Sequence, residues 1–264
     1  MINITSLKQM EKYFDEASQS YIFVENGELA DVNFEIDVDI MSDEECGCGC
    51  DHDHDCECGC DHDHDCDCDC DHDCDCDHDH DCDCCDDEDC DCEGCSCGCH
   101  DHDCESEEGT NGIVAANITG LNITCGFIKA RTIEVAESIT VEQSIECESV
   151  SAYEISSVML EAKLVEVGVL NSFVTIAKQI YANSVDCIDI ICDEISVSEN
   201  ILTCTLFAGK VLYNTFCIAK ERMKIHSAVG QRKNNILTCL DSEIVYEGEA
   251  YSPFGEYLAK KEQM

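Results

Sequence analysis

A repeat with a period of five residues constrains the fold of this chain more than any other feature. Between residues 113 and 211, twenty positions recur at intervals of five residues, with three intervals of six, and all but Thr175 are large and aliphatic. A mostly small residue follows each of them two positions later. Residues two apart in extended chain point to the same side, so we expect each pair to point inward. A chain that turns a corner every five residues and buries its inward face by stacking is a β-solenoid.

The five-residue period resembles that of bacterial pentapeptide-repeat proteins, whose fold is a four-sided, right-handed β-helix. For residues 113–211 this resemblance implies an all-β fold with about 20 residues per coil and about five coils. In that family the small inward residue precedes the large one by two positions, whereas here it follows. A looser likeness is to bacterial repeat proteins of tandem Ile-x-Ala units that end in an aromatic, cysteine and basic segment, here residues 213–220 and 229–235.

The segments on either side are predicted to cap the solenoid. Within residues 1–43, apolar residues at helical spacing predict a helix over residues 6–18, and alternation over residues 32–40 predicts a strand. These elements would form a small α/β N-terminal cap. Residues 212–264 read as further strands that cover the other end as a C-terminal cap, because an uncovered solenoid end exposes its edge.

Residues 44–104 form a low-complexity tract of a different composition. The tract contains only Cys, His, Asp, Glu, Gly and one Ser, with 20 of the 27 Cys, nine of the ten His and no Lys or Arg. Because Cys is its only apolar residue type, it cannot bury a conventional core. The motif repeats with a period near ten, and residues 105–112 read as a linker to the solenoid.

The tract has the composition of a metal-binding loop. Thiolate and imidazole are the donors that Zn²⁺ prefers, and thiolate also suits Cu(I). Cys-x-Cys spacing places successive thiols on one side of an extended chain, and the neighbouring Asp can donate oxygen or orient an imidazole. We predict several ions per chain, about five at four thiolates each, in a loop that is disordered without metal. The candidate ligands are Cys46, Cys48, Cys50, His52, His54, Cys56, Cys58, Cys60, His62, His64, Cys66, Cys68, Cys70, His72, Cys74, Cys76, His78, His80, Cys82, Cys84, Cys85, Cys90, Cys92, Cys95, Cys97, Cys99, His100, His102 and Cys104.

The density of Cys-x-Cys over residues 46–104 resembles that of metallothioneins. The resemblance implies multinuclear thiolate clusters that hold Zn, Cd or Cu(I). Asp stands where metallothioneins usually have Lys and Ser, and nine His are added. Tracts rich in Asp and His in proteins that handle nickel and zinc are a second likeness, so Ni joins the candidates, with Zn first.

The net charge of the chain and the motifs that it lacks argue against several other classes of function. The net charge of −45 argues against binding nucleic acid through its phosphates and favours cationic partners, of which metal ions are the smallest. No stretch is long and apolar enough to span a membrane, and no secretory signal is visible, so we expect a reducing cytoplasm. No enzyme motif rises above chance, and neither catalytic residues nor an organic cofactor are predicted.

Three alternatives stay open beside a non-enzymatic metal-binding function. The solenoid could be structural, associating with itself through its ends, with the tract as an acidic spacer or thiol cross-linker. It could be an acidic mimic of nucleic acid. The tract could also be an expansion by replication slippage that is merely tolerated.

The cysteines of the repeat itself are predicted to be structural. Cys125, Cys147, Cys187 and Cys192 stand where Ala and Val stand in other units, so we expect small buried hydrophobes rather than ligands. His226 is likewise expected to be structural. Five of the 14 basic residues fall in residues 220–233, which we expect to be a solvated surface.

Overall fold

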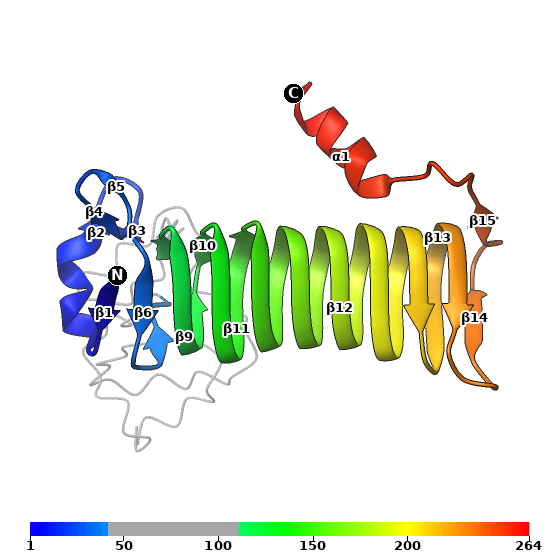
Figure 1. Ribbon diagram of the computed structural model, residues 1–264, viewed down its shortest axis with the longest axis horizontal. Coiled ribbons are helices and arrows are strands. Elements are labelled where there is room, and N and C mark those ends of the chain that lie inside the picture. The colour runs from blue at the N-terminus through cyan, green and yellow to red at the C-terminus, as the bar shows by residue number, and fades with distance from the viewer. Residues whose placement is uncertain (42–110, 264) are drawn as a thin grey trace, which may run out of the picture. The chain divides into compact units, whose positions relative to one another are not determined.

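The pentad repeat winds into a β-solenoid of about eight coils, which confirms the predicted fold class (Figure 1). The computed structural model describes residues 1–41 and 111–263. The strands of the N-terminal part are β1 (Ile2–Ile4), β2 (Phe14–Asp15), β3 (Ser20–Ile22), β4 (Val24–Glu25), β5 (Glu28–Leu29), β6 (Val32–Phe34) and β7 (Val38–Asp39). The remaining elements are β8 (Gly112–Val114), β9 (Asn117–Cys125), β10 (Phe127–Lys129), β11 (Thr132–Glu146), β12 (Ser149–Tyr213), β13 (Phe216–Gly230), β14 (Ile236–Cys239), β15 (Val245–Tyr246) and α1 (Pro253–Lys261).

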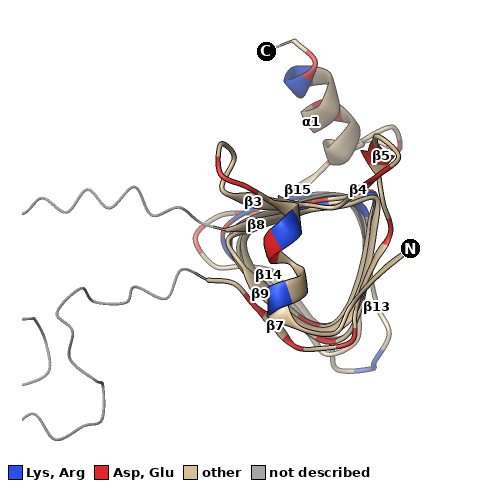
Figure 2. Cartoon of the chain, turned by 90° about the vertical axis from the view of Figure 1, so that its left-hand side faces the viewer, with Lys and Arg blue, Asp and Glu red and all other residues tan. Residues whose placement is uncertain are grey.

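Each coil has three sides. Neighbouring coils pair in parallel, and partners such as Thr132 and Asn117 lie 15 residues apart, which is three units of five. Looking along the stack, the coils have a triangular outline (Figure 2). The predicted four-sided coils of about 20 residues, about five in number, are therefore wrong. A period of five fixes the distance between corners, whereas the pairing with the next coil decides how many corners make a turn.

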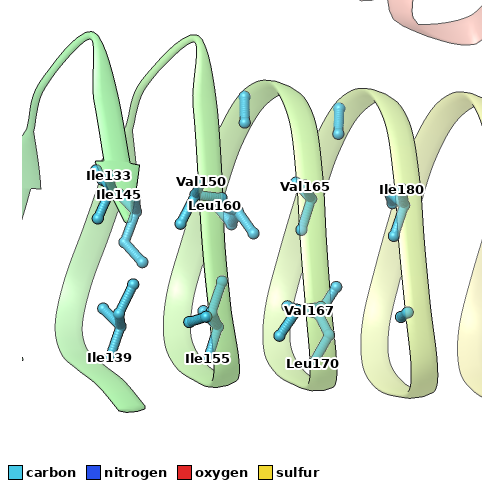
Figure 3. Packing of buried hydrophobic residues seen from close by; sticks show 14 of the residues in the cluster. Ile133, Ile139, Ile145, Val150, Ile155, Leu160, Val165, Val167, Leu170 and Ile180 are labelled. Atoms are coloured by element: carbon cyan, nitrogen blue, oxygen red, sulfur yellow. The ribbon is translucent and has the colours of Figure 1, made fainter. Parts of the chain in front are cut away.

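The predicted inward positions form the core. All twenty large positions are at most 1 % exposed, and their side chains stack from coil to coil inside the solenoid (Figure 3). They are Ile113, Ile118, Ile123, Ile128, Ile133, Ile139, Ile145, Val150, Ile155, Leu160, Val165, Leu170, Thr175, Ile180, Val185, Ile190, Ile195, Ile201, Leu206 and Val211. The small residues two positions later are also buried, except that Gly120, Ala130 and Cys147 are half-buried. Each large aliphatic side chain so buried contributes about 1.5–3 kcal/mol.

The six-residue intervals are absorbed at the corners. The ladder between β11 and its neighbours shifts register between Glu134 and Ser138, and again between Val141 and Ser144. An extra residue that bulges at a corner leaves the inward side chains on both sides in line. Ile139 and Ile155 therefore still face each other, although they lie 16 residues apart.

The solenoid extends beyond the repeat in both directions. We name its sides by their strands: face A carries β1 and β6, face B carries β7 and β14, and face C carries β3, β8, β10 and β15. The N-terminal strands join the same parallel ladders, with Val32 opposite Ile118 on face A and Val38 opposite Ile123 on face B. At the other end, β14 and β15 both pair with β13. The N-terminal segment thus forms the first coil as well as a cap.

The N-terminal end is closed by two 3₁₀ turns rather than by the predicted helix over residues 6–18. The turns span Leu7–Gln9 and Glu11–Tyr13 and cross the end of the first coil (Figure 2). Met10 and Phe23 are at most 1 % exposed, and the ring centroids of Tyr13 and Phe23 lie 4.8 Å apart. Met10 seals the coil end whereas Leu7 is 45 % exposed, so the apolar residues of this segment do not share the single face that an α-helix needs.

A C-terminal helix, which the sequence analysis did not predict, packs along the outside of face C. Asp193 accepts hydrogen bonds from the Ser252 hydroxyl at 2.7 Å and the Phe254 amide at 3.1 Å. Two coils nearer the N-terminus, Glu161 accepts from the Lys261 ammonium at 2.7 Å. The start of α1 was readable, because Ser252 caps the helix and Pro253 occupies its first turn.

Two buried threonines should respond in opposite ways to the same substitution. Thr175 occupies a large inward position, and its hydroxyl contacts only a weak partner in the Cys187 sulfur at 3.6 Å. We expect Thr175→Val to raise the free energy of unfolding by about 1 kcal/mol, because it removes a poorly satisfied buried hydroxyl. Chemical denaturation monitored by circular dichroism measures the change.

Thr203→Val is the matched control. The Thr203 hydroxyl lies 2.9 Å from the carbonyl oxygens of both Ile188 and Thr205. Its loss is expected to lower the free energy of unfolding by about 1 kcal/mol. Equal effects of the two substitutions would show that hydrogen-bond satisfaction does not distinguish these positions.

Candidate metal centre

The described residues on either side of the low-complexity tract lie at one corner of the solenoid. The chain leaves face B after β7 and returns as β8 in face C. The Ile40 amide donates to the Thr124 carbonyl at 3.0 Å, and the Gly126 amide donates to the Asn111 carbonyl at 2.7 Å. Ile40 and Asn111, the described residues that flank the tract, therefore lie against the same corner of the next coil.

The strands before and after this corner pair with the next coil without a shift in register. Asp39 pairs with Thr124, so Ile40 lies beside Cys125, and Gly112 pairs with Phe127, so Asn111 lies beside Gly126. Ile40 and Asn111 thus occupy two successive positions of an ordinary corner, although 70 residues separate them in the sequence. The coil needs none of those residues to keep its register.

The predicted ligands, from Cys46 to Cys104, all lie outside the described residues. Within residues 1–41 and 111–263, no group of three or more His, Cys, Asp or Glu is placed to hold a metal ion. His226 behaves as expected of a structural residue, since its Nδ1 lies 3.1 Å from the Glu247 carbonyl oxygen.

The described surface at the neighbouring corner is acidic. The Asn122 amide group donates to Asp37 at 2.9 Å and to Glu137 at 3.2 Å, and so links two carboxylates from the coils on either side of its own. Burial raises the pKa of Cys125, and the negative charge of Asp39, which lies next to Ile40, raises it further. Such a surface adds to the negative field of the tract and raises the local concentration of cations.

The burial predicted for the cysteines of the repeat is confirmed for three of the four. Cys125, Cys187 and Cys192 are at most 4 % exposed. Burial raises the pKa of all three thiols, to about 12 for Cys187. Cys147 is half-buried, and burial raises its pKa to about 12 as well. A thiol that stays protonated at neutral pH is a poor ligand and a poor nucleophile.

A groove on the outside of the solenoid explains the exposure of some small residues. It lies between the β4–β5 hairpin and α1 and has a volume of about 480 Å³. Leu29 and Leu258 line opposite sides, and Ala130 and Cys147 line it between them. The charged side chains at its rim pair with one another, at 3.0 Å for Lys129 with Glu146 and at 2.7 Å for Lys163 with Glu148.

The comparisons with known proteins assign no family to this chain, so its function is argued from its fold and its composition. The chain matches no family model, no curated protein and no solved structure. None of the helices described within residues 1–41 and 111–263 is both long enough and apolar enough to cross a membrane.

Removal of the whole tract should leave the solenoid folded. Deletion of residues 41–110 joins Ile40 to Asn111 and produces a corner of ordinary length. We expect the thermal unfolding midpoint to stay within a few degrees of that of the full chain under reducing, metal-free conditions. A deletion that also removes Ile40 and Asn111 should lower the midpoint, because it breaks the register. Loss of the cooperative transition in the in-frame variant would contradict this account.

The thiols of the core should resist alkylation in the folded protein. At pH 8 a raised pKa reduces the thiolate fraction, and burial blocks the reagent, so Cys125, Cys187, Cys192 and Cys217 are expected to stay unmodified by iodoacetamide. Cys239, which is half-buried, is the internal comparison. Peptide mass spectrometry before and after unfolding measures the difference. Full native modification of the four core thiols would contradict the structure.

Proposed function

We propose that this protein is a non-enzymatic metal-binding protein that buffers, stores or detoxifies soft or borderline metal ions. The observation that carries the proposal is the composition of residues 46–104, in which 20 Cys and nine His stand among carboxylates with no competing basic residue. Such a segment offers many more metal donors than a single site requires. The metallothionein-like density of Cys-x-Cys favours clusters in which thiolates bridge ions.

The placement of the tract supports this role. An insertion that enters and leaves at one corner, in frame, adds ligands without disturbing a fold that already has its own core. The acidic corner formed by Asp37 and Glu137 extends the negative field outside the tract. The solenoid then serves as a stable carrier, while the free energy of metal binding is available to order the tract.

Zn²⁺ is the ion we propose first. Mixed thiolate and imidazole donors suit it better than they suit Cu(I), for which thiolate alone is enough. Cd²⁺, Cu(I) and Ni²⁺ remain competitors because their preferred donors are also present. At four thiolates per ion the 20 Cys hold about five ions, and bridging or added imidazole raises that number.

Metal counting on the native protein tests the proposal. The full chain is purified from its host without air or chelator and analysed by native mass spectrometry and elemental analysis. We expect about five bound ions per chain, which acid should release because protons compete for the ligands. No more than one ion per chain would refute the proposal and would favour a spacer role for the tract.

Two variants locate the ions. The in-frame deletion of residues 41–110 is expected to bind none, although its solenoid stays folded. A variant in which Cys147, Cys204 and Cys239 are replaced by Ala keeps the tract and should retain the full metal content. Loss of metal in this second variant would place the ions on the solenoid instead.

A further inference from the structure

The two ends of the solenoid are finished differently. At the N-terminal end the two 3₁₀ turns cross the coil and bury Met10 and Phe23 (Figure 2). At the other end the last coil consists of β14, β15 and the final residues of β13. Both β14 and β15 pair with β13 alone, and within the described chain no further strand covers their outer edges. The chain then turns back along face C as the strap that holds α1 (Figure 1).

The uncovered end is apolar. Leu237 and Ile244 of the last coil pack against the core but stay half-buried. Val229, Ile236 and Val245 face the outer sides of the same coil and are 50 % to 53 % exposed. Solenoids that stay monomeric cover their terminal coil with a polar cap, because open strand edges are templates for pairing with another chain. Here the cap is present at one end and missing at the other.

The same end is electrically neutral in a strongly acidic protein. Residues 212–251, which precede α1, contain five acidic and five basic residues, whereas the whole chain carries a net charge of −45. Two copies repel each other over most of their surfaces, but this region adds no net repulsion of its own. Its charges are also separated, with Arg232 and Lys233 in the loop between faces A and B, and Asp241 and Glu243 between faces B and C.

We propose that this end is the interface of a two-fold symmetric dimer in which a second copy of the chain packs against it. A two-fold axis in the plane of the end, passing through face B, turns face B onto itself and exchanges faces A and C. The edge of β14 then meets the partner's β14 in antiparallel orientation. The same rotation brings Arg232 and Lys233 against Asp241 and Glu243 of the other copy.

The closed N-terminal end makes this assembly a dimer and not a filament. A head-to-tail contact would have to displace the turns that bury Met10 and Phe23. An isologous contact uses the same surface on both copies and therefore closes after two. The dimer does not depend on the metal-binding function, since it uses no residue of the tract.

Sedimentation equilibrium of the full chain tests the proposal. Reductant and chelator are included, so that neither disulfides nor metal ions can link the tracts. At micromolar concentrations we expect a mass of two chains. A mass of one chain overturns the proposal, and a mass that rises beyond two chains with concentration overturns the two-fold arrangement.

A charge beside the paired strand edges should weaken the dimer. Ile236→Glu places a carboxylate on the outer side of β14, next to the edge that meets the partner's β14, so we expect the dimer to dissociate at least about tenfold more readily. Phe173→Glu is the matched control, because Phe173 is 59 % exposed and lies away from the end. It is expected to leave the dimer intact. Unchanged thermal unfolding confirms that both variants fold, and a dimeric Ile236→Glu overturns the proposal.

A charge exchange tests the two-fold arrangement itself. Arg232→Glu with Lys233→Glu is expected to weaken the dimer, because it places acidic groups against Asp241 and Glu243. Adding Asp241→Lys and Glu243→Lys in the same chain should restore it. If the variant with all four substitutions associates no better than the variant with two, the proposed pairing of the corners is overturned.

Discussion

A constant register from coil to coil is the constraint on which the rest of the structure depends. Each side of a coil buries only one large and one small side chain, so no coil is stable without its neighbours. The backbone hydrogen bonds and the aliphatic stack both require that every turn return to the same register. Extra residues are therefore tolerated only where they leave that register unchanged. The bulges after Glu134 and Val141 and the long insertion after Ile40 all satisfy this condition at corners.

The sequence was sufficient to predict the inward residues but not the cross-section. Spacing within one coil is local, so the positions from Ile113 to Val211 could be read directly. The number of sides depends on which residue of the next coil lies opposite, and five-residue units fit three or four sides equally well. The observed pairing of Ile139 with Ile155, 16 residues further on, is what fixes coils of about 15 residues.

The ends were harder to predict because their partners are distant in sequence. The spacing of Leu7, Met10 and Phe14 suits an α-helix, yet Met10 seals the coil while Phe14 pairs in a short strand with Tyr21. The start of α1 was visible locally, but its anchors are 59 residues away at Asp193 and 100 residues away at Glu161. Of the candidate site, the sequence gives the donors, and the structure adds the corner at which the segment that carries them is inserted.

Cysteine serves two different purposes in this chain, and the difference follows from its surroundings. In the solenoid a thiol is surrounded by aliphatic side chains, which raise its pKa and keep it as a small core residue. In the tract no aliphatic neighbour exists in the sequence, so the driving force that buries the core thiols is missing. If the tract binds metal as proposed, the stability of the solenoid and the binding of metal are separate free energies. On that proposal, a change in metal supply loads or empties the tract while the coils that carry it stay folded.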